Sequence, residues 1–207
     1  MDDYPVSFSV EYPDRPLNRL TTAFRIFTVI PIAIVLAAIG DYQANWGGGN
    51  EARGVAVGGG LLVLPPLLML LFRQKYPRWW FDFNLELLRF TNRVGIYAGL
   101  LTDRYPSTDE QQSVRLEIPY PDAERDLNRW LPLVKWLLAI PHYFVLLALY
   151  ICTFVVVIIA WFAILFTGRF PRSLFDFVEG VVRWHNRVVA YVLVLATDRY
   201  PPFRLAA

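Results

Sequence analysis

The sequence predicts an all-α integral membrane protein built from two tandem repeats, and three observations predict it. Hydrophobic residues make up 56% of the chain, its mean hydropathy is +0.36, and charged residues make up 18%. This balance leaves too little charge for a water-soluble surface of ordinary composition. Short motifs also recur in the same order in both halves, and long apolar runs provide the length that membrane helices need.

The repeated motifs define the two halves. The pentapeptide TDRYP begins at Thr102 and again at Thr197, each time directly after an apolar run. Upstream of each copy lie YPD, LNR, FDF and NRV, in that order. We therefore predict a first repeat over residues 1–107 and a second over residues 108–207. Because each repeat is expected to cross the membrane an even number of times, the two should be related by a pseudo-two-fold axis along the membrane normal.

Each repeat is predicted to hold a short strand followed by two transmembrane helices. Alternating apolar residues predict strands at residues 5–12 and 113–119, which should pair with each other or pack on the helices. The run from Leu131 to Phe166 is too long for one crossing of about 20 residues, so we expect a tight turn near Tyr150. The predicted transmembrane helices cover residues 20–40 and 55–72 in the first repeat and residues 130–149 and 151–167 in the second. In the first repeat, the polar, glycine-rich stretch 41–54 is expected to join the two spans.

One amphipathic helix is predicted to close each repeat, over residues 78–101 and 172–196. Charged residues recur there at spacings of three and four, which places them on one stripe of a helix. The stripe comprises Asp82, Glu86, Arg89 and Arg93 in the first segment and Asp176, Arg183 and Arg187 in the second. Such a helix is typical of an anchor that lies along the membrane surface. An alternative is that both segments cross, giving inverted repeats and bringing these charges into the bilayer.

The basic residues predict the orientation. Of the 20 Lys and Arg residues, Arg53 alone lies between the first two spans, and the second turn has none. The positive-inside rule then places both termini and the middle segment in the cytoplasm. Together with the apolar spans, this predicts a multi-pass membrane protein.

A longer motif string resembles a known family. It reads "LNRWLPLVKWLLAIPHYFVLLAL" from Leu127 and continues as "WFAILFTGRFPRSLFDFVEGVVRWHNRVVAYVLVLATDRYPPF" from Trp161. This string resembles the bacterial membrane family known as domain of unknown function 4389. The first half resembles the family more loosely, departing at the glycine-rich insertion and at "RWWFDFNLELL". The resemblance implies placement in the bacterial inner membrane and a small module, and it implies no activity and no catalytic residues.

Two sets of charged residues are candidates for a binding role and a structural role. Arginine suits phosphate because its planar fork can bind two oxygens at once. The arginines expected to bind lipid headgroups are Arg89, Arg93, Arg104, Arg183, Arg187 and Arg199. In the structural alternative, the TDRYP aspartates turn the chain and pair with arginines such as Arg89 and Arg93. The aspartates expected in structural pairs are Asp82, Asp103, Asp176 and Asp198.

His142 is the candidate intramembrane polar residue, since it follows Pro141 inside a predicted span. An ionisable group at such a position is a candidate for a proton relay or ligand contact. The alternative is a neutral histidine bonded to a carbonyl that the proline frees. Because His142 and His185 are far apart in the sequence and no cysteine pair accompanies them, no metal site is predicted. No cofactor is expected either.

These features favour a non-enzymatic membrane protein, an accessory or assembly subunit that contacts anionic lipid through its cytoplasmic helices. Its expected partners are membrane lipids and a membrane protein or further copies of itself. Dispersed basic residues argue against nucleic acid as a partner. The alternative from another class is a small oligomeric transporter or channel. An enzyme acting on lipid would require Asp82, Asp176 and His185 to converge.

Overall fold

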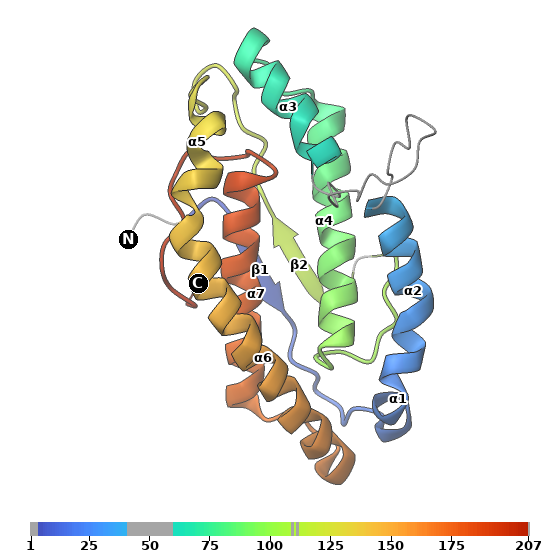
Figure 1. Cartoon of the computed structure of the whole chain (residues 1–207). Coiled ribbons are helices and arrows are strands. Elements are labelled where there is room, and N and C mark those ends of the chain that lie inside the picture. The colour runs from blue at the N-terminus through green and yellow to red at the C-terminus, as the bar shows by residue number, and fades with distance from the viewer. Residues whose placement is uncertain (1–3, 41–59, 109, 111, 207) are drawn as a thin grey trace, which may run out of the picture.

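The chain folds into three layers, and a computed structural model describes residues 4–40, 60–108, 110 and 112–206. A small sheet forms one outer layer, two amphipathic helices form the middle layer, and apolar helices form the other outer layer (Figure 1). The elements are β1 (Ser7–Val10), α1 (Arg19–Ala23), α2 (Arg25–Gly40), α3 (Gly60–Arg73), α4 (Arg78–Ala98), β2 (Val114–Glu117), α5 (Leu131–Leu138), α6 (Ile140–Thr167) and α7 (Arg172–Val192).

The sheet consists of β1 and β2, which pair antiparallel with Phe8 opposite Leu116. Burial alternates along both strands: Phe8 and Leu116 are buried, whereas their neighbours Ser9 and Arg115 are exposed. This alternation is expected of strands that pack on one face and meet water on the other. The sheet therefore has an apolar inner face and a polar outer face.

The middle layer consists of α4 and α7. Helix α4 packs against β2 and α2, while α7 packs against β1 and α6. The two helices are joined by Asn92 and Asn186, one in the C-terminal half of each, whose side-chain amides exchange two hydrogen bonds of 2.8 Å. Both amides are buried, so each satisfies polar atoms of the other. Phe81 and Phe175 extend from these helices into the main hydrophobic core.

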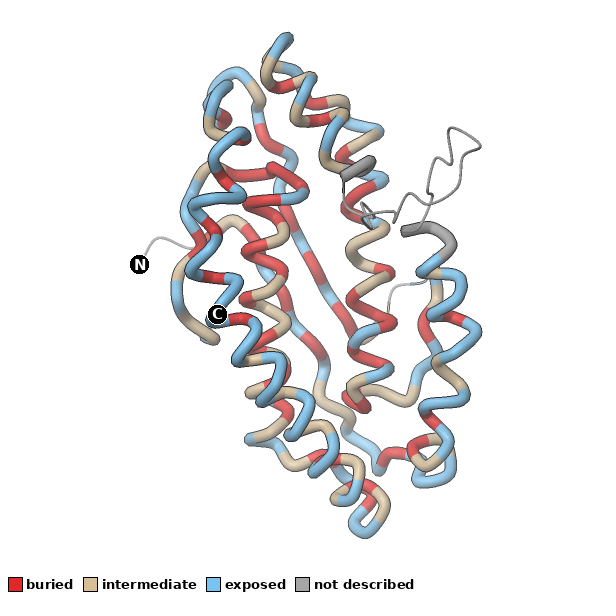
Figure 2. Tube along the Cα trace, viewed as in Figure 1, coloured by how far each residue is buried: buried red, intermediate tan, exposed pale blue. Residues whose placement is uncertain are grey.

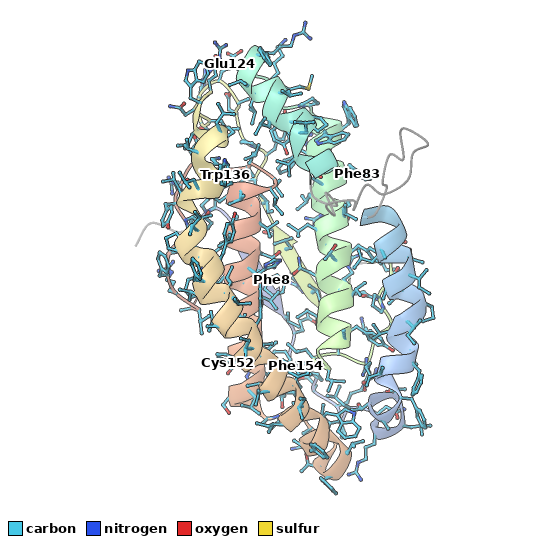
Figure 3. All side chains as sticks on the ribbon, viewed as in Figure 1. Phe8, Phe83, Glu124, Trp136, Cys152 and Phe154 are labelled. Carbon is cyan, nitrogen blue, oxygen red and sulfur yellow. The ribbon has the colours of Figure 1, made fainter. Side chains whose placement is uncertain are left out.

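The outer layer consists of α2, α5 and α6, and a narrow stripe of α6 faces inward. The buried residues of α6 are His142, Leu146, Ala160 and Ile164. The rest of its circumference is largely exposed (Figure 2). Trp136 on α5 and Cys152 and Phe154 on α6 are among the exposed side chains (Figure 3).

The predicted fold of two repeats with four transmembrane helices is wrong. Among the described residues, one helix, α6, is long and apolar enough to cross a membrane. The segment predicted to span at residues 20–40 is divided between α1 and α2, and α2 has 16 residues. Helix α3 has 14 residues, and the start of its predicted span lies outside the described residues, as does the predicted loop 41–54. The fold is also not all-α, because it contains the sheet.

The turn expected near Tyr150 is also wrong, because α6 is a continuous helix of 28 residues. The helical break falls instead at Ala139, between α5 and α6. Pro141 lies in the first turn of α6, where the missing amide hydrogen costs no helical hydrogen bond. The helix ends at Gly168, whose φ of 75° is the left-handed conformation that favours glycine. The sequence around Tyr150 contains neither a glycine nor a proline that could end a helix there.

The two amphipathic helices do not lie at the outer surface as interfacial anchors. The segments predicted at residues 78–101 and 172–196 form α4 and α7, which are covered by the sheet on one side and by apolar helices on the other. Their large hydrophobic faces are satisfied by this packing on two sides rather than by lipid.

Candidate functional site

The carboxylate of the first TDRYP motif anchors the start of the outer helices. Asp103 Oδ1 lies 2.5 Å from Nη2 of Arg25, and its Oδ2 accepts a 2.6 Å hydrogen bond from the backbone N–H of Asn18. The Arg25 side chain is 3% exposed, and its guanidinium also donates to the carbonyl of Thr102 at 2.9 Å and lies 4.0 Å from the ring centroid of Tyr97. Asp103 thus neutralises a buried cation.

The second TDRYP motif makes the matching set of contacts. Asp198 Oδ1 lies 2.8 Å from Nζ of Lys135, and its Oδ2 accepts a 2.5 Å hydrogen bond from the backbone N–H of Asn128. The Lys135 side chain is 1% exposed, donates to the carbonyl of Thr197 at 2.7 Å, and lies 5.0 Å from the ring centroid of Tyr191. Burial lowers the pKa of Lys135, and the Asp198 carboxylate opposes that shift.

The arginines of α7 hold the segment that follows the second TDRYP motif. Arg183 Nη1 donates to the carbonyl of Leu205 at 2.9 Å, and its Nε donates to the β1 carbonyl of Phe8 at 2.9 Å. Arg187 donates to the carbonyls of Arg204 and Ala206 at 3.2 and 2.9 Å. We call residues 203–206 the tail. The α7 arginines therefore bind backbone oxygens of the chain itself.

Gly180 makes room for this tail. A Cβ atom at this position would lie 2.9 Å from Cβ of Leu205 and 3.1 Å from its carbonyl oxygen. Contacts this short require the tail to move. The charged stripe of α4 has Glu86 at the matching position. The two middle helices therefore present different surfaces, although their arginines match.

The arginines of α4 instead line an open polar groove beside β2, which we call the arginine groove. It has a volume of about 610 Å³ and lies between α4, β2 and the segment after α4. Its lining residues are Glu11, Glu86, Arg89, Arg93, Arg104, Gln112, Val114, Arg115, Leu116 and Glu117.

Two of the groove arginines have carboxylate partners. Arg89 Nη1 lies 2.5 Å from Oε1 of Glu86, while its Nε donates to the β2 carbonyl of Leu116 at 3.0 Å. Arg115 lies 2.8 Å from Glu11 on the outer face of the sheet. These exposed pairs contribute little stability each, but they orient two of the guanidiniums that line the groove.

The other two groove arginines have no carboxylate partner among the described residues. Arg93 is 6% exposed, and its Nη1 donates to the carbonyls of Ser107 and Thr108 at 2.9 and 3.3 Å. Its buried Nε has no hydrogen-bond partner among the residues that the structure describes. Arg104 is exposed at the rim. The groove is therefore positively charged where these two residues meet it.

The six predicted headgroup arginines thus divide into two groups. Arg89, Arg93 and Arg104 line the arginine groove, whereas Arg183 and Arg187 contact β1 and the tail. Arg199 is exposed in the second TDRYP motif. Sequence reasoning missed the tail contacts because they join main-chain oxygens to helix residues, and no side-chain pattern reports them.

His142 is buried between α6, α7 and the tail. Its Nδ1 accepts a 3.0 Å hydrogen bond from the indole Nε1 of Trp184, which places the imidazole proton on Nε2. The ring stacks on Phe203 with centroids 4.0 Å apart. This partner differs from the proline-freed carbonyl that the sequence suggested. His142 therefore contributes to an aromatic cluster that holds the tail on α6 and α7.

The remaining candidate residues are not brought together. Asp82 lies 3.9 Å from Arg78 and Asp176 lies 2.9 Å from Arg172, each one helical turn away on its own helix. His185 Nδ1 is 2.6 Å from the hydroxyl of Tyr150, and burial lowers its pKa. Across residues 4–40, 60–108, 110 and 112–206, no group of three or more His, Cys, Asp or Glu residues could hold a metal ion.

One family model matches the chain. Residues 130–204 match the family described as domain of unknown function (DUF4389), which confirms the resemblance for that part of the sequence. The matched residues comprise α5, α6, α7, the second TDRYP motif and the start of the tail. Comparison with curated proteins and with solved structures gives no match.

Proposed function

We propose that this chain is a non-enzymatic membrane-associated protein that buries its outer helices in one leaflet and presents its sheet to water. The observation that carries this proposal is the exposure of α6. The helix has 28 residues and a mean hydropathy of 2.8 in its most apolar window, yet 11% of that window is buried within the fold. A core helix of a soluble protein would be mostly buried.

The exposed apolar surface extends beyond α6. Ile26 and Ile34 of α2 are 77% and 63% exposed, and Trp136 and Leu137 of α5 are 59% and 51% exposed. Large apolar side chains exposed on several helices mark a membrane or protein interaction surface. We propose that these helices together form one apolar layer.

The packing of α6 favours an orientation along the membrane rather than across it. Trp184 and Val188 of α7 belong to the same apolar cluster as Leu146 of α6, and near the other end of α6 the indole of Trp161 donates to the carbonyl of Thr22 in α1. Because α7 carries β1 on its other face, a crossing α6 would draw the charged outer face of the sheet into hydrocarbon. That burial of charge is costly. A helix lying in the interface avoids it.

The polar face of the sheet supports an accessory or assembly role at the water-facing surface. Arg115 and Glu117 point outward there, while the opposite face of the molecule is apolar. This two-faced arrangement suits a scaffold that stays at the membrane and binds a partner from the aqueous side. We propose the cytoplasmic side of a bacterial inner membrane as its location, because the anionic surface of that leaflet attracts basic side chains and the chain has a net charge of +2.

Membrane fractionation tests the proposal. Cell membranes containing the full chain are washed with alkaline carbonate, floated on a density gradient and then treated with mild detergent. The protein should float with the membranes after the wash and be released by detergent, because an embedded apolar surface resists high pH. Recovery in the carbonate supernatant would contradict membrane insertion.

A further inference from the structure

We propose that the arginine groove binds a ligand carrying a phosphate group. The groove lies on the sheet side of α4, away from the apolar layer, so this site is separate from the membrane surface proposed above. Its walls combine the outer face of β2, the arginine stripe of α4 and the first TDRYP motif.

The charge of the groove is unbalanced toward the positive. The pairs of Arg89 with Glu86 and of Arg115 with Glu11 neutralise one another. Arg93 and Arg104 have no carboxylate partner among the described residues, and the unpaired carboxylate of Glu117 offsets one of them, so the charged side chains that line the groove leave one net positive charge. Planar guanidinium groups bind phosphate oxygens in pairs, through charge-assisted hydrogen bonds.

Arg93 is built into the site rather than placed loosely on the surface. It is 6% exposed, and two main-chain carbonyls accept hydrogen bonds from its Nη1. Its Nε remains without a partner among the described residues, although a buried guanidinium normally satisfies its hydrogen bonds. A guanidinium fixed in this way loses little side-chain freedom when an oxyanion binds.

The second half of the chain shows what the matching arginines do when the space is filled. Arg183 and Arg187 bind the carbonyl oxygens of the tail, which lies over Gly180. In the first half, Glu86 stands at the matching position, and the groove of about 610 Å³ is open. The α4 arginines therefore face a space large enough for a ligand where the α7 arginines face the tail.

The groove is larger than a single phosphate ion, and its other polar groups fit the remainder of a small molecule. The carboxylate of Glu117 and the amide of Gln112 line the same groove, and these groups can bind hydroxyl or amine substituents. A small molecule that carries a phosphate together with hydroxyl or amine groups would fit both the arginines and these other polar groups. A lipid headgroup offers the same phosphate chemistry, but it would have to come from a membrane on the sheet side.

Titration calorimetry tests this site with the full chain held in phosphatidylcholine nanodiscs. Glycerol 3-phosphate and inorganic phosphate are the soluble probes, and vesicles containing phosphatidic acid are the lipid probe. We expect saturable binding of glycerol 3-phosphate that Arg104→Gln weakens by about tenfold, the effect of one charge-assisted contact. Arg115→Gln should also weaken it. Both side chains are exposed, so neither variant should impair folding.

The second TDRYP motif provides the matched control. Arg199→Gln removes the same charge from an exposed arginine in the same pentapeptide, and it should leave binding unchanged. The phosphatidic-acid vesicles are also tested for capture of the nanodiscs. If Arg104→Gln abolishes this capture, the result supports the site and assigns the phosphate to a lipid. Absence of binding to every probe would overturn the proposal, as would an equal loss in Arg199→Gln. Carbonate extraction reports insertion of the outer helices separately, so a failure of this site and a failure of the membrane proposal give different results.

Discussion

Replacing Asp198 with asparagine should destabilise the folded protein by about 3 to 5 kcal/mol, because removing one partner of a buried ion pair leaves an uncompensated charge. That charge is the ammonium of Lys135, whose side chain is 1% exposed and lies 2.8 Å from Asp198 Oδ1. The hydrogen bond from Lys135 to the carbonyl of Thr197 remains, which favours the lower end of the range. Urea unfolding in mild detergent, followed by tryptophan fluorescence, measures the loss.

The pH dependence of this loss provides a second, more specific result. Burial lowers the pKa of Lys135, and without Asp198 nothing in the pair opposes that shift. Folded Asp198→Asn should then release the Lys135 proton below the ordinary lysine pKa of about 10.4. Between these two pKa values, the unfolded variant keeps the proton that the folded variant has released. Raising the pH in this window therefore stabilises the folded variant. The stability difference from the parent protein should therefore shrink between pH 7 and pH 10.

Asp103→Asn is the matched control for this behaviour. Asp103 pairs with Arg25, whose side chain is buried like that of Lys135, and arginine as a residue type does not titrate between pH 7 and pH 10. Its stability loss should therefore stay nearly constant from pH 7 to pH 10. Equal pH dependence in both variants would contradict the assignment of the Asp198 effect to Lys135.

Replacing Ile151 and Phe154 with glutamate should weaken membrane binding by at least about a hundredfold. These side chains are 62% and 69% exposed on α6. Withdrawing two large apolar side chains from hydrocarbon costs about 1.5 to 3 kcal/mol each, and about 1.4 kcal/mol is a tenfold change in partition. Flotation with phospholipid vesicles at a series of lipid concentrations measures the partition coefficient.

Ser7→Glu with Ser9→Glu is the control for this double variant. Both serines are exposed on the outer face of β1, so the change in net charge is the same but occurs on the water-facing side. This control should float like the parent protein. If both double variants lost binding equally, net charge rather than insertion of α6 would explain the result.

The local elements of this fold were more accessible from sequence than their arrangement. Alternation around Phe8 and Leu116 indicated strands, and the structure pairs them at β1 and β2. The charged stripe that includes Arg89 and Arg183 indicated amphipathic helices, and these segments form α4 and α7. Both signals arise from residues close together in the chain, where side-chain periodicity reports the element type directly.

The arrangement was not predicted because apolarity alone does not say what covers a helix. Helices α4 and α7 have large apolar faces that bury against protein on two sides, and sequence reasoning assigned one of those sides to lipid. The break at Ala139 was missed because Pro141 was placed inside a predicted span, whereas it lies in the first turn of α6. The carboxylate of Asp198 was expected to pair with an arginine, but its partner is Lys135 on α5, a choice that only tertiary packing makes.

The depth of α6 in a bilayer tests the central claim most directly. A fluorophore is attached at Cys152, or at Leu137→Cys or Phe166→Cys in a Cys152→Ser background, and is quenched by lipids labelled at defined depths. All three side chains are exposed on the apolar layer, at the start, middle and end of the α5 and α6 region. We predict similar, shallow depths for all three, within one leaflet. Deep quenching at Cys152 with shallow quenching at both ends would show that α6 crosses the membrane, and quenching of all three by aqueous iodide would show that the apolar layer is not embedded.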